Sequence, residues 1–282
     1  MVPSPSPVLT VPPFFLTLPG LSTARFAGGF TACGPCGARL RRPDTVFRYN
    51  GKMPKRPPRK GDLPKDGVRR LLVFDLDGTL IDSKTDMANS VNHTLTTFGL
   101  KPLPHPTIFR YVGNGAAMLI RRSLGAEREA VLREALHLFL DHYGRHLLAT
   151  TLPYPGVEEC LREHMDAYEM ALLTNKPIGM TRAILDGLSL SEYFVEVYGG
   201  DSFGTKKPDP EGLRAILSGQ GVDPAEALMV GDSVNDVLAG RRAGVATCGV
   251  TYGLGAEGFA LHPPDFTIDR FPELFDRIRP GR

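Results

Sequence analysis

Three apolar segments, each ending in a polar residue, constrain the fold of this chain more than any other feature. They are "LLVFDLD" (71–77), "EMALLT" (169–174) and "ALMVGD" (227–232). A run of successive apolar residues suits a strand that is buried on both faces, as in the interior of a parallel sheet. Helical stretches lie between the strands. This alternation predicts an α/β protein with a Rossmann-like, doubly wound parallel sheet as its core.

The other predicted elements are shorter. Strands are expected at 194–199, 245–250 and 265–268, and helices at 156–165, 179–188, 209–219 and 233–244. Residues 85–152 contain no convincing strand, and their apolar residues recur at spacings of three or four, as on one face of a helix. The residues with this spacing are Leu132, Leu136, Phe139, Tyr143 and Leu147. We therefore predict a core of residues 67–84 and 153–282, with residues 85–152 inserted as an all-helical cap domain.

Polar residues stand at the ends of the three long strands. These residues are Asp75 and Asp77, Thr174 and Asn175, and Asp232. In doubly wound sheets the ligand site gathers at the carboxyl ends of the strands, so these side chains are expected to converge. Asp75 and Asp77 would repel each other there unless a cation or a shared proton relieved them. The pair therefore indicates a metal or acid/base site.

The first 66 residues differ in composition from the rest of the chain. They hold 12 of the 25 prolines, and residues 1–70 carry 13 lysines and arginines against 3 acidic residues. This composition predicts a disordered or non-native extension. Two interpretations stay open: translation starts at Met53, or the extension targets an organelle. The basic excess lies outside the predicted fold, so no nucleic-acid partner is expected.

Other features of the chain favour an ordinary reduced, cytoplasmic protein. The sequence shows no secretory signal and no stretch as long as a membrane span. Cys33 and Cys36 have redox-pair or zinc-site spacing, but a redox pair needs a flanking strand and helix, and zinc needs two further ligands. His142 and His146 lie one helical turn apart without an evident third ligand, which favours a solvated helix face.

Four segments occur in a recognisable order: "DLDGTLIDS", "LLTNK", "KKPDP" and "VGDSVND". Together they resemble the four motifs of the haloacid dehalogenase superfamily, and the resemblance covers about residues 69–282. It implies that Asp75 is a nucleophile that forms an aspartyl-phosphate, and that Asp77 protonates the leaving alcohol and later activates water. Thr174 and nearby backbone amides would hold the phosphoryl oxygens, while Lys207 would pair with the phosphate and Asp75.

The same resemblance implies Mg²⁺ as the cofactor. Asp75, Asp232 and the main-chain carbonyl of Asp77 would bind the ion, and Asp236 would support this shell. Oxygen ligands together with substrate phosphate are what Mg²⁺ prefers. The aspartate two residues after the nucleophile, which relatives that cleave other bonds lack, favours hydrolysis of a phosphate ester or a phosphomutase reaction.

Within the superfamily, the amino-acid sequences of several segments are similar to those of phosphoglycolate phosphatases. These segments are "YVGNGAAMLIRRSLG" (111–125), "LPYPGV", "TNKP", "GGDSFGTKKPDP" and "GVTYG", and "TYGLGAEG" departs from the family wording. The likeness implies hydrolysis of 2-phosphoglycolate to glycolate and phosphate. Substrate contacts are expected from Asn175 and from the flexible segment Gly113, Asn114 and Gly115, with Arg110, Arg121 or Arg122 meeting a substrate carboxylate.

Other functions stay open at this stage. The enzyme could be a phosphatase for another small phosphorylated metabolite, or an isomerase of the β-phosphoglucomutase type. A module that binds phospho-ligands without catalysis is disfavoured, because it would have no need of the nucleophile. We expect no membrane partner, and either a monomer or a homodimer.

Overall fold

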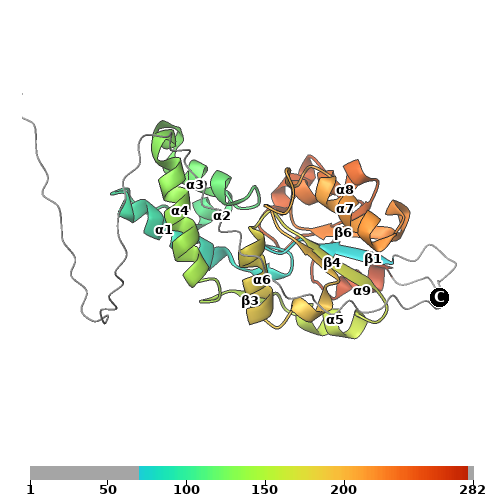
Figure 1. Ribbon diagram of the computed structural model, residues 1–282. Helices are drawn as coiled ribbons and strands as arrows, with labels where there is room; N and C mark the ends of the chain where they lie inside the picture. The colour runs from blue at the N-terminus through green and yellow to red at the C-terminus, as the bar shows by residue number, and fades with distance from the viewer. Residues whose placement is uncertain (1–69, 279–282) are drawn as a thin grey trace, which may run out of the picture. The chain divides into compact units, whose positions relative to one another are not determined.

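The computed structural model describes residues 70–278, in which six strands form one parallel sheet (Figure 1). In sheet order these strands are β5 (Glu196–Tyr198), β4 (Glu169–Leu173), β1 (Leu71–Phe74), β6 (Ala227–Gly231), β7 (Ala246–Val250) and β8 (Phe266–Ile268). At the centre of the sheet, Leu72 of β1 lies opposite Met170 on one side and Leu228 on the other. The predicted α/β fold with a parallel sheet is confirmed.

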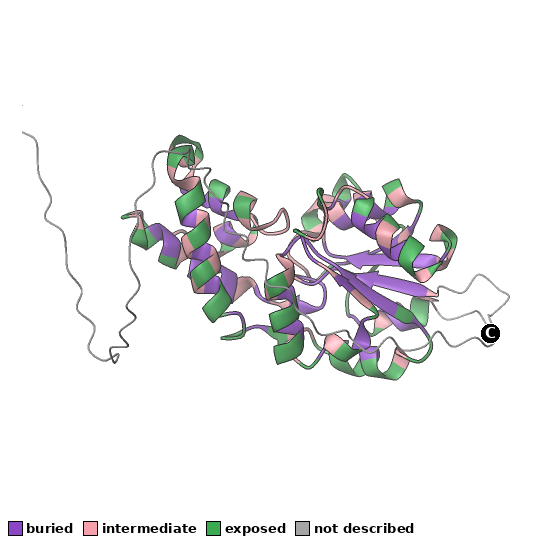
Figure 2. Cartoon of the chain, in the orientation of Figure 1, coloured by how far each residue is buried: buried purple, intermediate pink, exposed green. Residues whose placement is uncertain are grey.

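Helices cover both faces of the sheet. Side chains alternate along β1, so Leu72 and Phe74 enter one apolar core while Leu71 and Val73 enter the other. The first core is completed by α5 (Val157–His164), α6 (Ile178–Gly187) and α9 (Glu273–Ile278). The opposite face carries α7 (Glu211–Gln220) and α8 (Val234–Ala243) (Figure 1). Figure 2 shows the strands as the most continuously buried part.

A block of helices lies between β1 and β4 in the sequence. It contains α1 (Lys84–Thr97), α2 (His105–Phe109), α3 (Ala116–Leu124), the 3₁₀ helix Ala126–Val131 and α4 (Leu132–Arg145). We call residues 84–145 the helical insertion. Its helices pack on one another through buried apolar side chains such as Leu95, Ile120 and Phe139. Tyr143 of α4, part of the predicted apolar face, is also buried.

A short two-stranded ladder joins the insertion to the core. Strand β2 (Ile81–Asp82) pairs antiparallel with β3 (Leu152–Pro153), with Ile81 opposite Pro153. The expectation of no strand within residues 85–152 is therefore wrong at its last residue, Leu152. Two paired residues are too few to produce an alternating apolar pattern, so the sequence carries no signal for this ladder.

Several smaller expectations can be compared with the structure. Cys160 and Cys248 are buried and unpaired, as expected. The rings of His142 and His146 stack with each other and with His93, and His146 is exposed. Met53, Cys33 and Cys36 lie outside the described residues. Between residues 70 and 278, no helix combines the length and the apolar character needed to cross a membrane. Three further 3₁₀ helices span Ser191–Tyr193, Pro224–Glu226 and Ala256–Ala260.

Candidate active site

The polar residues that follow β1, β4 and β6 meet at the carboxyl edge of the sheet. Each strand is followed directly by one of these residues: β1 by Asp75, β4 by Thr174 and β6 by Asp232. All three side chains are buried. Asp236 joins them from the first turn of α8. Carboxylate oxygens of Asp75, Asp232 and Asp236 all lie within 4.8 Å of one another. The structure thus brings together three carboxylates that are far apart in the sequence.

Lys207 lies against this carboxylate group. Its Nζ is 2.9 Å from Oδ1 of Asp75 and 2.6 Å from Oδ1 of Asp236. Burial opposes the charge of Lys207, but the two carboxylates outweigh it and raise the pKa of the lysine. Burial also raises the pKa of Asp75 to about 6, although Lys207 acts in the opposite direction. Lys207 is therefore a permanent cation beside a carboxylate that holds its proton more readily than usual.

Main-chain groups surround the carboxylate of Asp232 closely. Its Oδ2 accepts hydrogen bonds from the amides of Leu254 (2.6 Å) and Gly255 (3.1 Å). A Cβ on Gly78 would lie 2.2 Å from that same oxygen, so only glycine leaves room for the carboxylate there. Burial, with the neighbouring charges of Asp75 and Asp236, raises the pKa of Asp232 well above its ordinary value.

The charge balance of this group fits a divalent cation. Three buried carboxylates share one buried ammonium, which leaves two negative charges without a counter-charge when all are ionised. The hydrogen bonds of Asp232 within residues 70–278 fall on its Oδ2, which leaves Oδ1 for a cation, whereas Asp236 is engaged by Lys207 and by the amide and hydroxyl of Ser233. The donor atoms are all oxygens, which suits a hard cation. Asp75 and Asp232 are the best placed to bind it, with Asp236 behind them.

Asp77 faces away from the three carboxylates. Its Oδ1 accepts hydrogen bonds from Lys176 Nζ (2.7 Å) and from the hydroxyl of Ser83 (2.5 Å). Lys176 Nζ also donates to the hydroxyl of Tyr143, again at 2.7 Å. Burial opposes the charge of Lys176, but Asp77 and Tyr143 outweigh it and raise the pKa of this lysine. The side chain of Asp77 is therefore half of an ion pair rather than part of the metal-binding group.

Two asparagines connect the core to the helical insertion. Nδ2 of Asn175 donates to the carbonyls of Gly113 and Lys207, both at 2.9 Å. Nδ2 of Asn235 donates to the Gly113 carbonyl at 3.2 Å and to Asn114 Oδ1 at 3.0 Å. One carbonyl of the insertion thus accepts hydrogen bonds from two core segments. These contacts place the Gly113–Gly115 segment over the carboxyl edge of the sheet.

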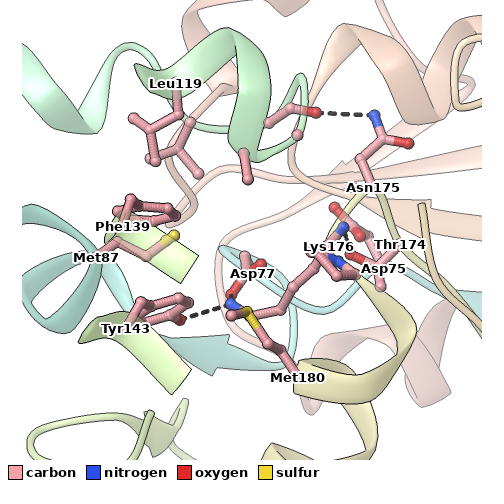
Figure 3. A pocket seen from close by; sticks show the side chains of 15 residues that line it. Asp75, Asp77, Met87, Leu119, Phe139, Tyr143, Thr174, Asn175, Lys176 and Met180 are labelled. Carbon is pink, nitrogen blue, oxygen red and sulfur yellow. Dashed lines mark hydrogen bonds and ion pairs between the residues drawn. The ribbon is translucent and has the colours of Figure 1, made fainter. Parts of the chain in front are cut away.

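A pocket lies between this segment and the carboxylates (Figure 3). Its volume is roughly 50 Å³, within a recess of roughly 500 Å³ that includes open solvent. Its polar lining comes mainly from the core, and its apolar lining comes mainly from the insertion. The lining residues are Asp75, Asp77, Met87, Val112, Gly113, Gly115, Ala116, Leu119, Phe139, Tyr143, Thr174, Asn175, Lys176, Pro177 and Met180.

The structure brings most of the site residues expected from the sequence to this region. Gly113, Gly115, Thr174 and Asn175 line the pocket, whereas Asn114 does not. None of the three arginines proposed to meet a carboxylate lines the pocket either. Arg121 pairs with Glu129 on the surface, and Arg122 donates to the carbonyl of Tyr111. A substrate carboxylate would therefore have to find another partner.

Lys176 and Tyr143 were missed as site residues. Lys176 follows Asn175 directly in "LLTNK", so its place beside the strand end was a signal that could have found it. Tyr143 was assigned to the apolar face of its helix, and its ring does pack against Phe139. Only the fold shows that its hydroxyl reaches the pocket, because α4 and Lys176 are far apart in the sequence.

Comparison with known proteins assigns the family. Residues 72–250 match the family model described as haloacid dehalogenase-like hydrolase. A protein of Psychrobacter arcticus named phosphoglycolate phosphatase is 41% identical over 221 residues, which cover 74% of this chain and 96% of that protein. A Pseudomonas putida protein of the same name is 43% identical over 192 residues, covering 65% of this chain and 70% of its own.

Solved structures agree with this result. A crystal structure of a protein from Haemophilus somnus, described as a predicted phosphoglycolate phosphatase, matches with a TM-score of 0.71 and 32% sequence identity. The match covers 75% of this chain and 98% of that one. The chain belongs to the haloacid dehalogenase-like hydrolase family. It is an enzyme of the phosphoric monoester hydrolase class, as the sequence motifs predicted.

Proposed function

We propose that this enzyme hydrolyses 2-phosphoglycolate to glycolate and phosphate through an aspartyl-phosphate on Asp75, with Mg²⁺ as cofactor. The observation that carries the chemistry is the buried group of Asp75, Asp232 and Asp236, in which Lys207 contacts Asp75 and Asp236 and Asp75 lines a small pocket. The names of the relatives from Psychrobacter arcticus and Pseudomonas putida support the substrate. The region of this chain matching the Psychrobacter protein covers nearly all of that relative's length.

In the first half-reaction, a carboxylate oxygen of Asp75 attacks phosphorus and the bond from phosphorus to the ester oxygen breaks. Lys207, 2.9 Å from Asp75, offsets the negative charge that the phosphoryl group brings to the nucleophile. Thr174 and neighbouring amides hold the phosphoryl oxygens. Asp77, which takes up a proton from solvent when it leaves Lys176, gives that proton to the departing oxygen, and the product leaves as a neutral alcohol.

In the second half-reaction, water attacks the phosphorus of the aspartyl-phosphate. Asp77, now a carboxylate, accepts the proton of that water, and the bond between phosphorus and the Asp75 oxygen breaks. Phosphate leaves, and both aspartates return to their starting states. Asp75, Asp232 and the main-chain carbonyl of Asp77 would hold Mg²⁺, with Asp236 in support, and the ion would supply positive charge against the phosphoryl oxygens.

We assign substrate positioning to the helical insertion, which we propose acts as a cap over the core. Asn175 holds the Gly113 carbonyl, and Gly113 and Gly115 line the pocket opposite the nucleophile. Gly115 has a φ of 83°, which favours glycine, so the backbone there can approach a ligand closely. Asn114 contributes by fixing this segment to Asn235 rather than by lining the pocket.

The test is phosphate release from a panel of phosphate monoesters, with Mg²⁺ and with EDTA. The panel contains 2-phosphoglycolate, ethyl phosphate, glycerol phosphate and β-glucose 1-phosphate. We expect 2-phosphoglycolate to give the highest kcat/KM, and EDTA to abolish turnover. Conversion of β-glucose 1-phosphate to glucose 6-phosphate, without release of phosphate, would instead identify an isomerase.

A further inference from the structure

Lys176 is the only positively charged side chain among the described residues that line the pocket. Its side chain is 4% exposed, and Figure 3 shows it beside Asp77 with its amino group joined to the hydroxyl of Tyr143. Its amino group also lies 4.8 Å from the centre of the Tyr143 ring. A buried lysine held by two groups at 2.7 Å is well ordered, and the reaction proposed above gives it no role.

Two other lysines are nearby, and neither lines the pocket: Lys206, whose Nζ would lie 3.2 Å from a Cβ on Gly115, is exposed, and Lys207 is already engaged. Lys207 contacts Asp75 and Asp236 beneath the phosphoryl position, so its charge is directed at the nucleophile. The remaining lining, apart from Asp75 and Asp77, consists of neutral polar or apolar side chains. A substrate whose phosphoryl group meets Asp75 must extend into this space. A second negative group on that substrate would find Lys176 as its only cationic partner within the described lining.

We infer that Lys176 binds the carboxylate of the substrate and so selects phosphate esters that carry a second negative group. The inference rests on the proposed function. On binding, the substrate carboxylate replaces Asp77 as the ionic partner of Lys176, so the lysine stays paired throughout. Tyr143 keeps the ammonium in place during the exchange. Asp77 is then free to meet the ester oxygen, whereas an ester without a carboxylate leaves Asp77 bound to Lys176.

If the substrate carboxylate replaces Asp77 at Lys176, then loss of Lys176 should change the preference between substrates rather than lower the hydrolysis of every phosphate ester. The wild-type enzyme is expected to prefer 2-phosphoglycolate over ethyl phosphate by at least about a hundredfold in kcat/KM. Lys176→Met keeps the length and apolar stem of the side chain but removes its charge. We expect this variant to lose about 30- to 100-fold in kcat/KM on 2-phosphoglycolate and to hydrolyse ethyl phosphate faster than the wild type, because the lysine no longer holds Asp77.

Two further variants complete the experiment. Lys84→Met is the matched control, because Lys84 also forms an ion pair at 2.7 Å, with Asp82, and does not line the pocket. We expect it to keep the wild-type selectivity. Tyr143→Phe retains the ring but removes the hydroxyl that orients Lys176. We expect Tyr143→Phe to lose about three- to tenfold in kcat/KM on 2-phosphoglycolate and to keep its kcat/KM on ethyl phosphate. If Lys176→Met does not fold, this variant alone tests the inference.

Each outcome separates this inference from the function on which it rests. If the wild type prefers 2-phosphoglycolate and Lys176→Met keeps that preference, Lys176 does not read the carboxylate, while the proposed function stands. Equal losses on both esters would also overturn the inference, because Lys176 would then act only by supporting Asp77. If the wild type hydrolyses both esters equally well, the proposed substrate and the inference both fail.

Discussion

At the scale of single residues, Asp75 is subject to two opposing influences. Burial favours its protonated form, and Lys207 favours its charged form, with a net rise of the pKa to about 6. Near neutral pH the carboxylate is mostly ionised and able to attack. Lys207 thus keeps Asp75 from becoming a permanently neutral acid, against both burial and the neighbouring carboxylates of Asp236 and Asp77.

Asp75→Asn should abolish turnover without loss of the fold. The amide preserves the shape of the side chain but removes the nucleophile, so we expect a loss of at least about a thousandfold in kcat. Phosphate release measures activity, and circular dichroism checks the fold. Asp141→Asn, at an exposed site on α4, is the matched control and should behave like wild type. Activity above a few per cent in Asp75→Asn would contradict the covalent mechanism.

Asp77→Ala should separate the two half-reactions. With 4-nitrophenyl phosphate the leaving group needs no proton, so transfer to Asp75 should stay fast while attack by water slows about 100- to 10,000-fold. Stopped-flow absorbance is expected to show a burst of about one nitrophenolate per enzyme followed by a stall. Steady release at the wild-type rate would show that Asp77 does not activate water.

The pH dependence of metal binding follows from the raised pKa of Asp75. Below pH 6 most of the metal-free protein carries a proton on Asp75, and a metal must displace it. We therefore expect the affinity for Mg²⁺ to fall as pH falls through about 6, by up to about tenfold per pH unit for one proton. Calorimetric titrations at pH 5.0 and pH 7.5 measure this difference. Equal affinity at both values would contradict it.

At the scale of elements, Asp86 ties the start of the helical insertion to the segment that follows it. It stands in the first turn of α1 and accepts four hydrogen bonds, from the amides and hydroxyls of Thr150 and Thr151. Burial would raise the pKa of Asp86, but these hydrogen bonds outweigh it and lower the pKa. A lowered pKa means that the carboxylate stabilises the fold above its unfolded-state pKa, and that this contribution disappears as pH falls through the lower, folded-state value.

Asp86→Asn tests this link. The amide can accept fewer of the four hydrogen bonds, so the free energy of unfolding should fall by about 1–3 kcal/mol at pH 7. Urea denaturation followed by circular dichroism gives this value. The difference from wild type should shrink as pH falls below the unfolded-state pKa of about 3.9 and through the lower folded-state value, because the wild-type carboxylate then becomes protonated. Asp141→Asn should change stability little, and a comparable loss there would argue against a special role for Asp86.

Elements with strong local patterns were predictable from the sequence. The strands β1, β4 and β6 are continuous apolar runs, and their polar ends identified the edge at which Asp75, Thr174 and Asp232 meet. The β2–β3 ladder was not predictable, because each strand has only two residues. Its partners are also separated by the whole helical insertion.

Side-chain partners were less predictable than strand ends. Arg110, Arg121 and Arg122 were reasonable carboxylate partners because they flank the glycine segment, yet none lines the pocket. The cation in the pocket is Lys176, which reaches Tyr143 across a long separation in the sequence. The departure "TYGLGAEG" likewise carries a contact that no pattern indicated, since the amides of Leu254 and Gly255 hold Asp232.

At the scale of the whole molecule, the buried carboxylates of Asp75, Asp232 and Asp236 repel one another inside the core. Their surplus negative charge opposes folding until a cation relieves it. At a Mg²⁺ concentration about 100 times the dissociation constant, we expect about 2.7 kcal/mol of added stability, or a rise of roughly 5–10 °C in Tm. Differential scanning calorimetry with Mg²⁺ and with EDTA measures the shift.

A control variant identifies the source of that stabilisation. Asp232→Asn removes one proposed ligand, so its Tm should respond much less to Mg²⁺ than that of the wild type. Asp141→Asn should respond as the wild type does. An unchanged Tm of the wild-type protein on addition of Mg²⁺ would mean that the ion does not bind this group with useful affinity.

The β2–β3 ladder makes the departure and return of the inserted helices adjacent in space, with Ile81 opposite Pro153. An exchange of everything between these two points would leave all six strands of the main sheet and their connections intact. The nucleophile and its carboxylate neighbours belong to the part that stays, whereas Tyr143 and Gly113 belong to the part that is replaced. The architecture is therefore modular: grafting another helical block would replace most of the apolar lining of the pocket and the hydroxyl that holds Lys176, while Asp75, Asp77 and Lys176 would stay in place.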